Sequence, residues 1–319
     1  MPTLTVRLFG KFSARHREQT LDGLDASKVQ ELLSYLLVRR DRPHPREALA
    51  SLLWGDATTE KSKKYLRQAL WHLQNALSGE EEGEADSLLT AEHDWVQLRL
   101  GTEVWLDVAA FEGAYTSVRD RAGRDMSAQD ACALQEAVRL YRGDLLEGWY
   151  QDWCLFERER LQNIYLSMLH KLMGYCGAHC EYETGQHYGS LILSQDRASE
   201  RTHRHLMYLH YAAGDRTAAL RQYERCVAAL EEELGVGPDG RTVRLYEQIR
   251  ADHLLGEAPA PAPQPPPQQQ PPGLASLPEM LGRLRQLQDI LSDVQQRVQH
   301  DIREVELALK QKAHRATNR

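Results

Sequence analysis

The sequence lacks the features that mark membrane-spanning and secreted proteins. No run of apolar residues approaches the roughly 20 that a helix needs to cross a bilayer. The N-terminus, Met1-Pro2-Thr3-Leu4, shows no basic region followed by an apolar one, so no signal peptide is expected. The five cysteines are odd in number and widely scattered, which fits reduced thiols better than a disulfide framework. We therefore expect a cytoplasmic protein without membrane contact.

The chain also has little that indicates catalysis or a resident cofactor. Gly10-Lys11-Phe12 lacks both the upstream glycine and the following Ser or Thr of a phosphate-binding loop, so no nucleotide site is predicted. His170, Cys176, His179 and Cys180 are possible zinc ligands by type, but all four would have to converge on one point. No motif suggests a catalytic triad. We predict a protein that is not an enzyme and holds neither cofactor nor metal.

The charge is unevenly distributed along the 319 residues. A net charge of −7 argues against a protein that coats nucleic acid without selectivity, but it allows a local basic surface. Residues 1–77 carry 13 Lys and Arg against 8 Asp and Glu, whereas residues 78–98 carry seven acidic residues and no Lys or Arg. The acidic run at 80–84 would repel phosphate, so we expect it on a loop that faces away from any bound DNA.

A basic amphipathic helix is predicted from residue 60 to residue 77. Leucines recur at steps of four, three and four and form one stripe: Leu66, Leu70, Leu73 and Leu77. The opposite face carries Lys61, Lys64, Gln68, Trp71, His72 and Asn75. Lysines can reach phosphates, and Gln and Asn amides offer the donor and acceptor that adenine presents in the major groove. The pattern is typical of a recognition helix, although an ordinary solvated helix face is an alternative.

The surrounding segments support a winged helix-turn-helix. Residues 4–9 and 12–14 alternate as short strands, and residues 26–38 form a second amphipathic helix. Pro45 can occupy the first turn of a third helix that runs to Leu53. Two strands, at 88–90 and 95–100, then flank Glu92-His93-Asp94 as a hairpin. Strands, three helices and a hairpin are the order of a winged helix preceded by a small sheet.

The hairpin is a candidate wing. We expect His93 or Arg99 to approach a phosphate or the minor groove, and Trp95 to pack beneath the hairpin. In the alternative, only Trp95 matters, and only for folding.

From residue 106 to residue 255 the pattern is helical and contains a repeat. Cys180-Glu181-Tyr182 and Gly185 align with Gly214-Asp215-Arg216 and Ala219 at an offset of 34 residues, the tetratricopeptide period. Stacked helix pairs of this kind leave a concave surface that suits protein or peptide binding. Three histidines share one helix with Arg201 and Arg204 and are interpreted as a solvated face or protein contact: His203, His205 and His210.

The C-terminal part changes composition abruptly. Residues 259–272 are mostly Pro and Gln, which predicts an extended linker. Beyond it a coiled-coil seam follows steps of four and three, with a stutter around Val298: Met280, Leu284, Leu287, Leu291, Val294 and Val298. An isolated helix cannot bury this stripe alone, so it needs a copy of itself or another protein. Folding back onto the helical middle is the alternative.

Four motifs occur in order and carry a family resemblance. They are Leu52-Leu53-Trp54-Gly55-Asp56, Asp152-Trp153-Cys154 with Glu157-Arg158-Glu159-Arg160-Leu161, the segment 213–220, and Glu232-Glu233-Leu234-Gly235-Val236-Gly237-Pro238. Over residues 4–255 the chain resembles a bacterial transcriptional activator domain (BTAD) behind an OmpR-type winged helix, as in SARP-type activators. The resemblance implies oligomeric binding to direct repeats in promoters and recruitment of RNA polymerase. The segment His72-Leu73-Gln74-Asn75 departs from the family, which often has arginines there, so phosphate contacts are expected to be fewer.

We therefore predict a mainly α protein in four parts: an OmpR-type winged-helix DNA-binding domain at 1–103, a TPR-like BTAD at 104–256, a Pro/Gln-rich linker at 257–273 and a coiled-coil helix at 274–319. The predicted function is a sequence-specific activator that binds double-stranded promoter DNA as a homo-oligomer and recruits RNA polymerase or its sigma factor. The alternative is a scaffold that assembles a protein complex. The candidate DNA-binding residues are Lys61, Lys63, Lys64, Arg67, Gln68, Trp71, His72, Asn75, His93 and Arg99.

Overall fold

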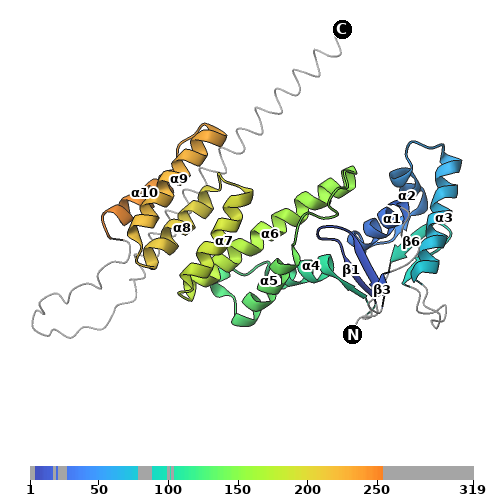
Figure 1. Ribbon diagram of the computed structural model, residues 1–319, viewed down its shortest axis with the longest axis horizontal. Coiled ribbons are helices and arrows are strands. Elements are labelled where there is room, and N and C mark those ends of the chain that lie inside the picture. Colours follow the sequence, from blue (N-terminus) through green and yellow to red (C-terminus); the bar gives the residue numbers. More distant parts are fainter. Residues whose placement is uncertain are drawn as a thin grey trace, which may run out of the picture. The chain divides into compact units, whose positions relative to one another are not determined.

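The computed structural model describes residues 4–16, 19–20, 27–77, 88–98, 101 and 104–253. The strands are β1 (Leu4–Arg7), β2 (Ser13–His16), β3 (Gln19–Thr20), β4 (His44–Pro45), β5 (Leu89–Ala91), β6 (Trp95–Leu98) and β7 (Val104–Leu106). The helices are α1 (Ser27–Val38), α2 (Arg46–Leu53), α3 (Thr59–Leu77), α4 (Asp107–Val118), α5 (Ala128–Leu140), α6 (Asp152–Ala178), α7 (Tyr182–Gln195), α8 (Glu200–Ala212), α9 (Arg216–Leu234) and α10 (Gly240–Arg250) (Figure 1). The predicted class, mainly α with small N-terminal sheets, is confirmed.

Several predicted features lie outside the described residues. These are the acidic run at 80–84, Arg99, the Pro/Gln-rich linker and the C-terminal coiled coil.

The first sheet has the strand order β3-β2-β1-β7. Val6 lies opposite Ala14 of β2 in an antiparallel pair and opposite Leu106 of β7 in a parallel pair. Gly10 adopts a φ of 83°, which a residue without a Cβ reaches at no steric cost, and this allows the chain to turn after β1. The parallel pairing of β1 with β7 brings the start of the chain to the start of α4.

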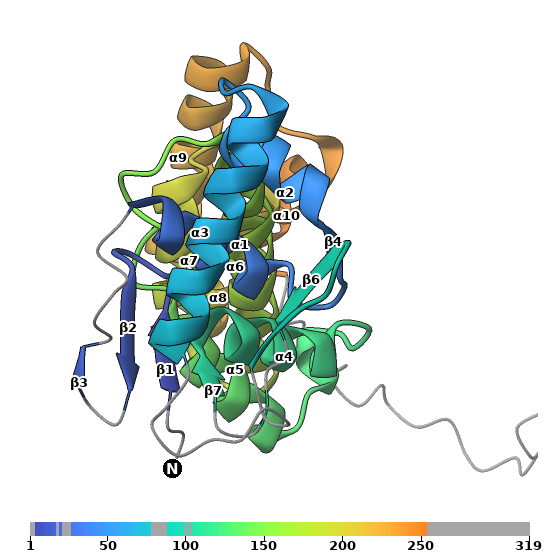
Figure 2. The same ribbon diagram turned by 90° about the vertical axis from the view of Figure 1, so that its right-hand side faces the viewer.

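Helices α1, α2 and α3 pack with the second sheet, which has the order β4-β6-β5. Strands β5 and β6 form the predicted hairpin, with Thr90 opposite Gln97. Pro45 differs from the prediction, because it pairs with β6 as part of β4 and only caps α2. Its ψ of 134° explains the difference: a proline φ suits either a helix or a strand, and here ψ is extended. Figure 2 looks onto α3, with β4 and β6 next to it.

The helical part stacks in sequence order, with each of the helices α6 to α10 contacting the next (Figure 1). The predicted 34-residue repeat has a backbone counterpart. Cys180 and Gly214 occupy the same turn position, with φ values of 60° and 86°. A Cβ on Gly185 would lie 2.9 Å from the Leu209 side chain, which explains the small residue there. The aligned Ala219 is fully buried.

One prediction about this region is wrong. His203 belongs to the interior rather than to a solvated face, with 3% of its surface exposed. Its Nε2 lies 2.9 Å from the Arg197 carbonyl oxygen and its Nδ1 lies 2.8 Å from the Gln222 amide nitrogen. An imidazole can be buried when both ring nitrogens have partners. His205 and His210 are partly buried.

The larger of two hydrophobic clusters in the described residues runs from β1 through the three N-terminal helices into α8, and a smaller one joins α8, α9 and α10. Phe9 packs against Phe111 of α4, with ring centroids 5.0 Å apart. The Asp107 carboxylate, 3% exposed, accepts hydrogen bonds from the backbone N–H groups of Leu8, Phe9 and Val108. The winged helix and the helical part are therefore joined by buried apolar and polar contacts.

Candidate nucleic-acid interface

Helix α3 buries one stripe and exposes the rest. Leu66, Leu70 and Leu73 are at most 2% exposed, in agreement with the predicted leucine stripe. Near its N-terminal end the Ser62 hydroxyl donates to the Trp54 carbonyl oxygen at 2.9 Å, which ties α3 to the turn after α2. With one face fixed in the core, the opposite face of α3 is held in a defined orientation toward solvent.

Most of the predicted recognition residues share that exposed face. Of the predicted residues on α3, His72 is half-buried and the others are exposed: Lys61, Lys63, Lys64, Arg67, Gln68, Trp71 and Asn75. Trp71 is 58% exposed and lies edge-on to the His72 ring at 5.0 Å between centroids. The face thus combines cations, amides and one aromatic ring.

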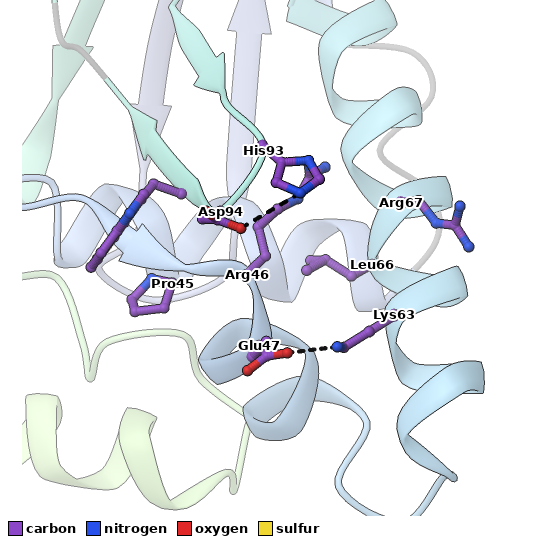
Figure 3. A pocket seen from close by; sticks show the side chains of 9 residues that line it. Pro45, Arg46, Glu47, Lys63, Leu66, Arg67, His93 and Asp94 are labelled. Carbon is purple, nitrogen blue, oxygen red and sulfur yellow. Dashed lines mark hydrogen bonds and ion pairs between the residues drawn. The ribbon is translucent and has the colours of Figure 1, made fainter.

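Lys63 differs from the other lysines because it has an internal partner. Its Nζ lies 2.6 Å from Glu47 Oε1 of α2, and this hydrogen bond holds the pKa of Glu47 below its usual value. Figure 3 shows Lys63 directed toward α2, while Arg67 extends away from the Glu47–Lys63 pair. A cation already paired in this way has less to gain from a phosphate than Lys61 or Lys64, which have no such pair among the described residues.

A shallow groove of about 790 Å³ separates the turn of the hairpin from α3. Arg46 fixes this turn: its backbone N–H donates to the Asp94 carbonyl and its guanidinium to the Glu92 carbonyl, both at 2.9 Å. His93 stands at the tip with 98% of its side chain exposed, 3.9 Å from the Asp94 carboxylate (Figure 3). Helix α3 and the tip therefore form the two sides of one surface.

The expected position of Trp95 is wrong. It is 46% exposed rather than packed beneath the hairpin. The cause is the two-residue period of β6, because Val96 and Leu98 take the inward positions and Trp95 must point the other way. Trp95 instead lines the groove together with His93 and Arg67.

Arg46 is a candidate that sequence reasoning missed. It lines the groove beside His93, although it belongs to α2 and lies far from both α3 and the hairpin in sequence. Only the pairing of His44 and Pro45 with β6 brings it there. No sequence periodicity signals a two-residue strand.

The described residues show no cluster suited to metal or membrane chemistry. No group of three or more His, Cys, Asp or Glu side chains in the described ranges is placed to hold a metal ion. Of the residues considered as zinc ligands, Cys176 donates to Glu181 and His179 stacks on Tyr175 at 4.0 Å. Within the same ranges no helix has the length and apolarity that spanning a bilayer requires.

The motif at the start of α6 joins the winged helix to the helical part. Trp153 packs edge-on against Tyr35 of α1, with centroids 5.3 Å apart, and its indole N–H donates to the buried Glu31 carboxylate. Glu157, 1% exposed, pairs with Arg39, which directly follows α1, and with Arg160. These residues belong to a motif that carries the family resemblance, and in the structure they hold α6 against α1 and the residue that follows it.

The other motifs form turns between helices. Trp54 and Gly55 lie between α2 and α3, and a Cβ on Gly55 would come within 2.9 Å of the Ser51 carbonyl oxygen. Gly235 ends α9 with a φ of 65°, and Asp239 caps α10 by accepting from the N–H groups of Arg241 and Thr242. Residues of these types suit helix junctions, where a left-handed turn or a capping side chain is needed.

Comparisons with known proteins agree with this architecture. A model of the family described as "Bacterial transcriptional activator domain" matches residues 106–250. Among solved structures the chain is similar to Mycobacterium tuberculosis EmbR in complex with a low-affinity phosphopeptide, with a TM-score of 0.62 and 18% identity. That similarity covers 79% of this chain and 66% of the EmbR chain, so this chain spans just under two thirds of its length. A search of curated proteins finds no match. Residues 106–250 are therefore similar to a bacterial transcriptional activator domain, and a winged helix followed by such a helical domain is a fold that this chain shares with EmbR.

Proposed function

We propose that the protein regulates transcription by binding double-stranded promoter DNA in a sequence-specific manner. The single observation that supports this is the exposed face of α3, where Lys61, Lys64, Gln68 and Asn75 project opposite a leucine stripe that is buried at Leu66, Leu70 and Leu73 and partly buried at Leu77. In this proposal α3 enters the major groove and the tip at His93 approaches the adjacent backbone. Trp71 and His72 flank the base-reading amides, and Arg67 and Arg46 add phosphate contacts.

The two kinds of polar residue on α3 should have separable effects. Lys64→Ala should weaken binding to specific and nonspecific duplexes alike and reduce the salt dependence by about one counterion, because a lysine contacts phosphate. Gln68→Ala and Asn75→Ala should instead relax sequence preference by about 1–3 kcal/mol for each lost base contact.

The experiment begins with genome-wide mapping of DNA sites, followed by gel shifts on the recovered operator and a scrambled duplex. Lys11→Ala is the matched control, since it removes an exposed lysine from the same domain outside α3. If Gln68→Ala and Asn75→Ala discriminate between the two duplexes as well as the wild type does, α3 does not read the sequence.

A second candidate function is a scaffold whose winged helix binds protein. It is favoured by one observation, the exposure of two tryptophans of the winged helix, Trp71 at 58% and Trp95 at 46%. Exposed aromatic rings are common anchors of protein interfaces. Salt separates the two functions: phosphate contacts give a steep loss of DNA affinity with added salt, whereas a scaffold forms no such DNA complex.

Two finer parts of the proposal rest on the family alone. We infer that the protein binds direct repeats as a homo-oligomer and activates by recruiting RNA polymerase or its sigma factor. Transcription in vitro from a mapped promoter, with purified polymerase, tests the second part, since a protein that binds the operator without raising transcript yield is not an activator there.

A cytoplasmic location remains a prediction that follows from the five free cysteines.

A further inference from the structure

A second groove lies in the helical part, far in sequence from α3. It has a volume of about 650 Å³ and is lined by residues of α7, α8 and α9, with Arg197 from the α7–α8 connection. We call it the α7–α9 groove. Its polar lining residues include Glu183, His187, Arg197, His203, His210, Gln222 and Arg225.

A hydrogen-bonded chain fixes the cationic side of this groove. The Arg197 carbonyl can only accept, so Nε2 of His203 carries the proton and donates to it, and Nδ1 accepts from the Gln222 amide. Burial lowers the pKa of His203, in keeping with a neutral ring. The Gln222 amide oxygen then accepts from the Arg225 guanidinium at 3.4 Å. Two side chains that are 3% exposed thus position an exposed cation.

Arg225 is a cation without a carboxylate. Among the described residues it forms no ion pair, and it donates a hydrogen bond to the neutral amide of Gln222. Arg197 pairs with Glu232 and Glu233 at 3.2 and 3.9 Å, in exposed positions where such pairs are weak. Glu183 is the single acidic residue in the lining. The groove therefore favours a ligand of negative charge.

The dimensions indicate an extended peptide rather than a small anion. The lining on α7 runs from Glu183 to Ser194, about 17 Å at 1.5 Å per residue, which matches about five residues of extended chain. The lining contains no Phe, Tyr or Trp on which nucleic-acid bases could stack. Leu193, Leu206 and Ala229 offer apolar contacts along the floor and wall.

We propose that the α7–α9 groove binds an extended, acidic peptide segment of a partner protein, with Arg225 as the main contact for a carboxylate. This interaction goes beyond DNA recognition and does not depend on it, because it uses none of the residues of α3 or the hairpin.

The test is fluorescence anisotropy with the full chain at low ionic strength. The probe is a labelled peptide of alternating Glu and Gly, and the control peptide has Gln in place of Glu. Arg225→Ala should weaken binding of the Glu peptide about tenfold, as expected for the loss of one charge-assisted hydrogen bond. Glu183→Gln should strengthen it severalfold, because it removes the acid from the lining. Arg241→Ala is the matched control: it removes one exposed arginine from α10, which contributes nothing to the groove.

Opposite effects of two exposed substitutions cannot arise from misfolding. Equal affinities for the Glu and Gln peptides would overturn the proposal, and so would equal losses in Arg225→Ala and Arg241→Ala. Displacement of the Glu peptide by excess duplex DNA would place the peptide on the winged helix instead, and would likewise overturn it. A failure of DNA binding in the gel shifts would leave the peptide result unaffected.

Discussion

Replacing Asp107 by alanine should destabilise the protein, because this carboxylate holds three buried backbone donors. It accepts from Leu8 at 3.0 and 2.8 Å, from Phe9 at 3.0 Å and from Val108 at 2.7 Å. A buried donor left without a partner costs about 1–3 kcal/mol, so three would cost about 3–9 kcal/mol. The bonds also join the segment that follows β1 to the start of α4, and their loss affects both parts of the chain.

A second effect reduces this figure. Burial raises the pKa of Asp107 above its usual value even though the three backbone hydrogen bonds act to lower it. Burial of the ionised carboxylate therefore has a desolvation cost, and removing the carboxylate removes this cost as well. We expect Asp107→Ala to lose about 2–4 kcal/mol, a large part of the roughly 5–15 kcal/mol that stabilises a typical domain. Asp107→Asn should lose less, since its amide oxygen still accepts.

Urea unfolding of the full chain, followed by tryptophan fluorescence, measures the difference. Asp125→Ala is the control, because that carboxylate is 62% exposed and its nearest cation is 3.8 Å away. Such a surface change should stay within about 0.5 kcal/mol. If the midpoints of Asp107→Ala and Asp125→Ala coincide, the buried hydrogen bonds do not join the two parts as argued.

Two further predictions concern pH and assembly. Burial, with smaller contributions from Arg201 and His205, lowers the pKa of His170 to about 4. The unfolded chain takes up a proton near pH 6.5 and the folded one does not, so stability present at neutral pH is lost as the pH falls, by up to about 3 kcal/mol. Urea titrations at neutral pH and at pH about 4 measure how far the free energy of unfolding falls between the two. The fall should be smaller by about 3 kcal/mol in His170→Gln than in the wild type. In His187→Gln, a substitution at an exposed site, the fall should equal that of the wild type. Removal of residues 273–319 should lower the oligomeric mass in light scattering without changing the melting temperature. If neither the mass nor the melting temperature changes, the C-terminal helix binds an unknown partner. If the mass stays the same and the melting temperature falls, the C-terminal part folds back onto the helical part.

Periodicity in the sequence predicted the elements that depend on burying a regular stripe. The leucines of α3 and the two-residue alternation of residues 4–9 both follow from local geometry, and the structure confirms a helix and a strand, β1, at these places. The 34-residue offset also worked, because Cys180 and Gly214 must adopt the same left-handed turn between packed helices. In each case a residue's neighbours along the chain determine its environment.

The features that were not predicted depend on contacts between residues far apart in the sequence. The inward orientation of Trp95 was wrongly inferred because hydrophobicity alone does not state which face of a two-residue period lies inside. His203 was interpreted as solvated because its partners, Gln222 and the Arg197 carbonyl, come from other elements. Arg46 was missed for the same reason. Polar residues that are satisfied across elements have no local signature.

The buried carboxylates between α1 and α6 also have partners on other elements, and these contacts affect the proposed function. Glu31 and Glu157 are each 1% exposed, and their partners are divided between the winged helix and the helical part. Breaking a buried pair by removing one partner leaves an uncompensated charge, which costs about 3–5 kcal/mol. A winged-helix fragment that ends at residue 103 would lose Trp153 beside Glu31, the β7 strand beside β1 and the Phe111 ring beside Phe9. The proposed recognition face of α3 rests on a core that the helical part completes, so we expect substitutions in α6 to weaken the proposed DNA binding without touching α3.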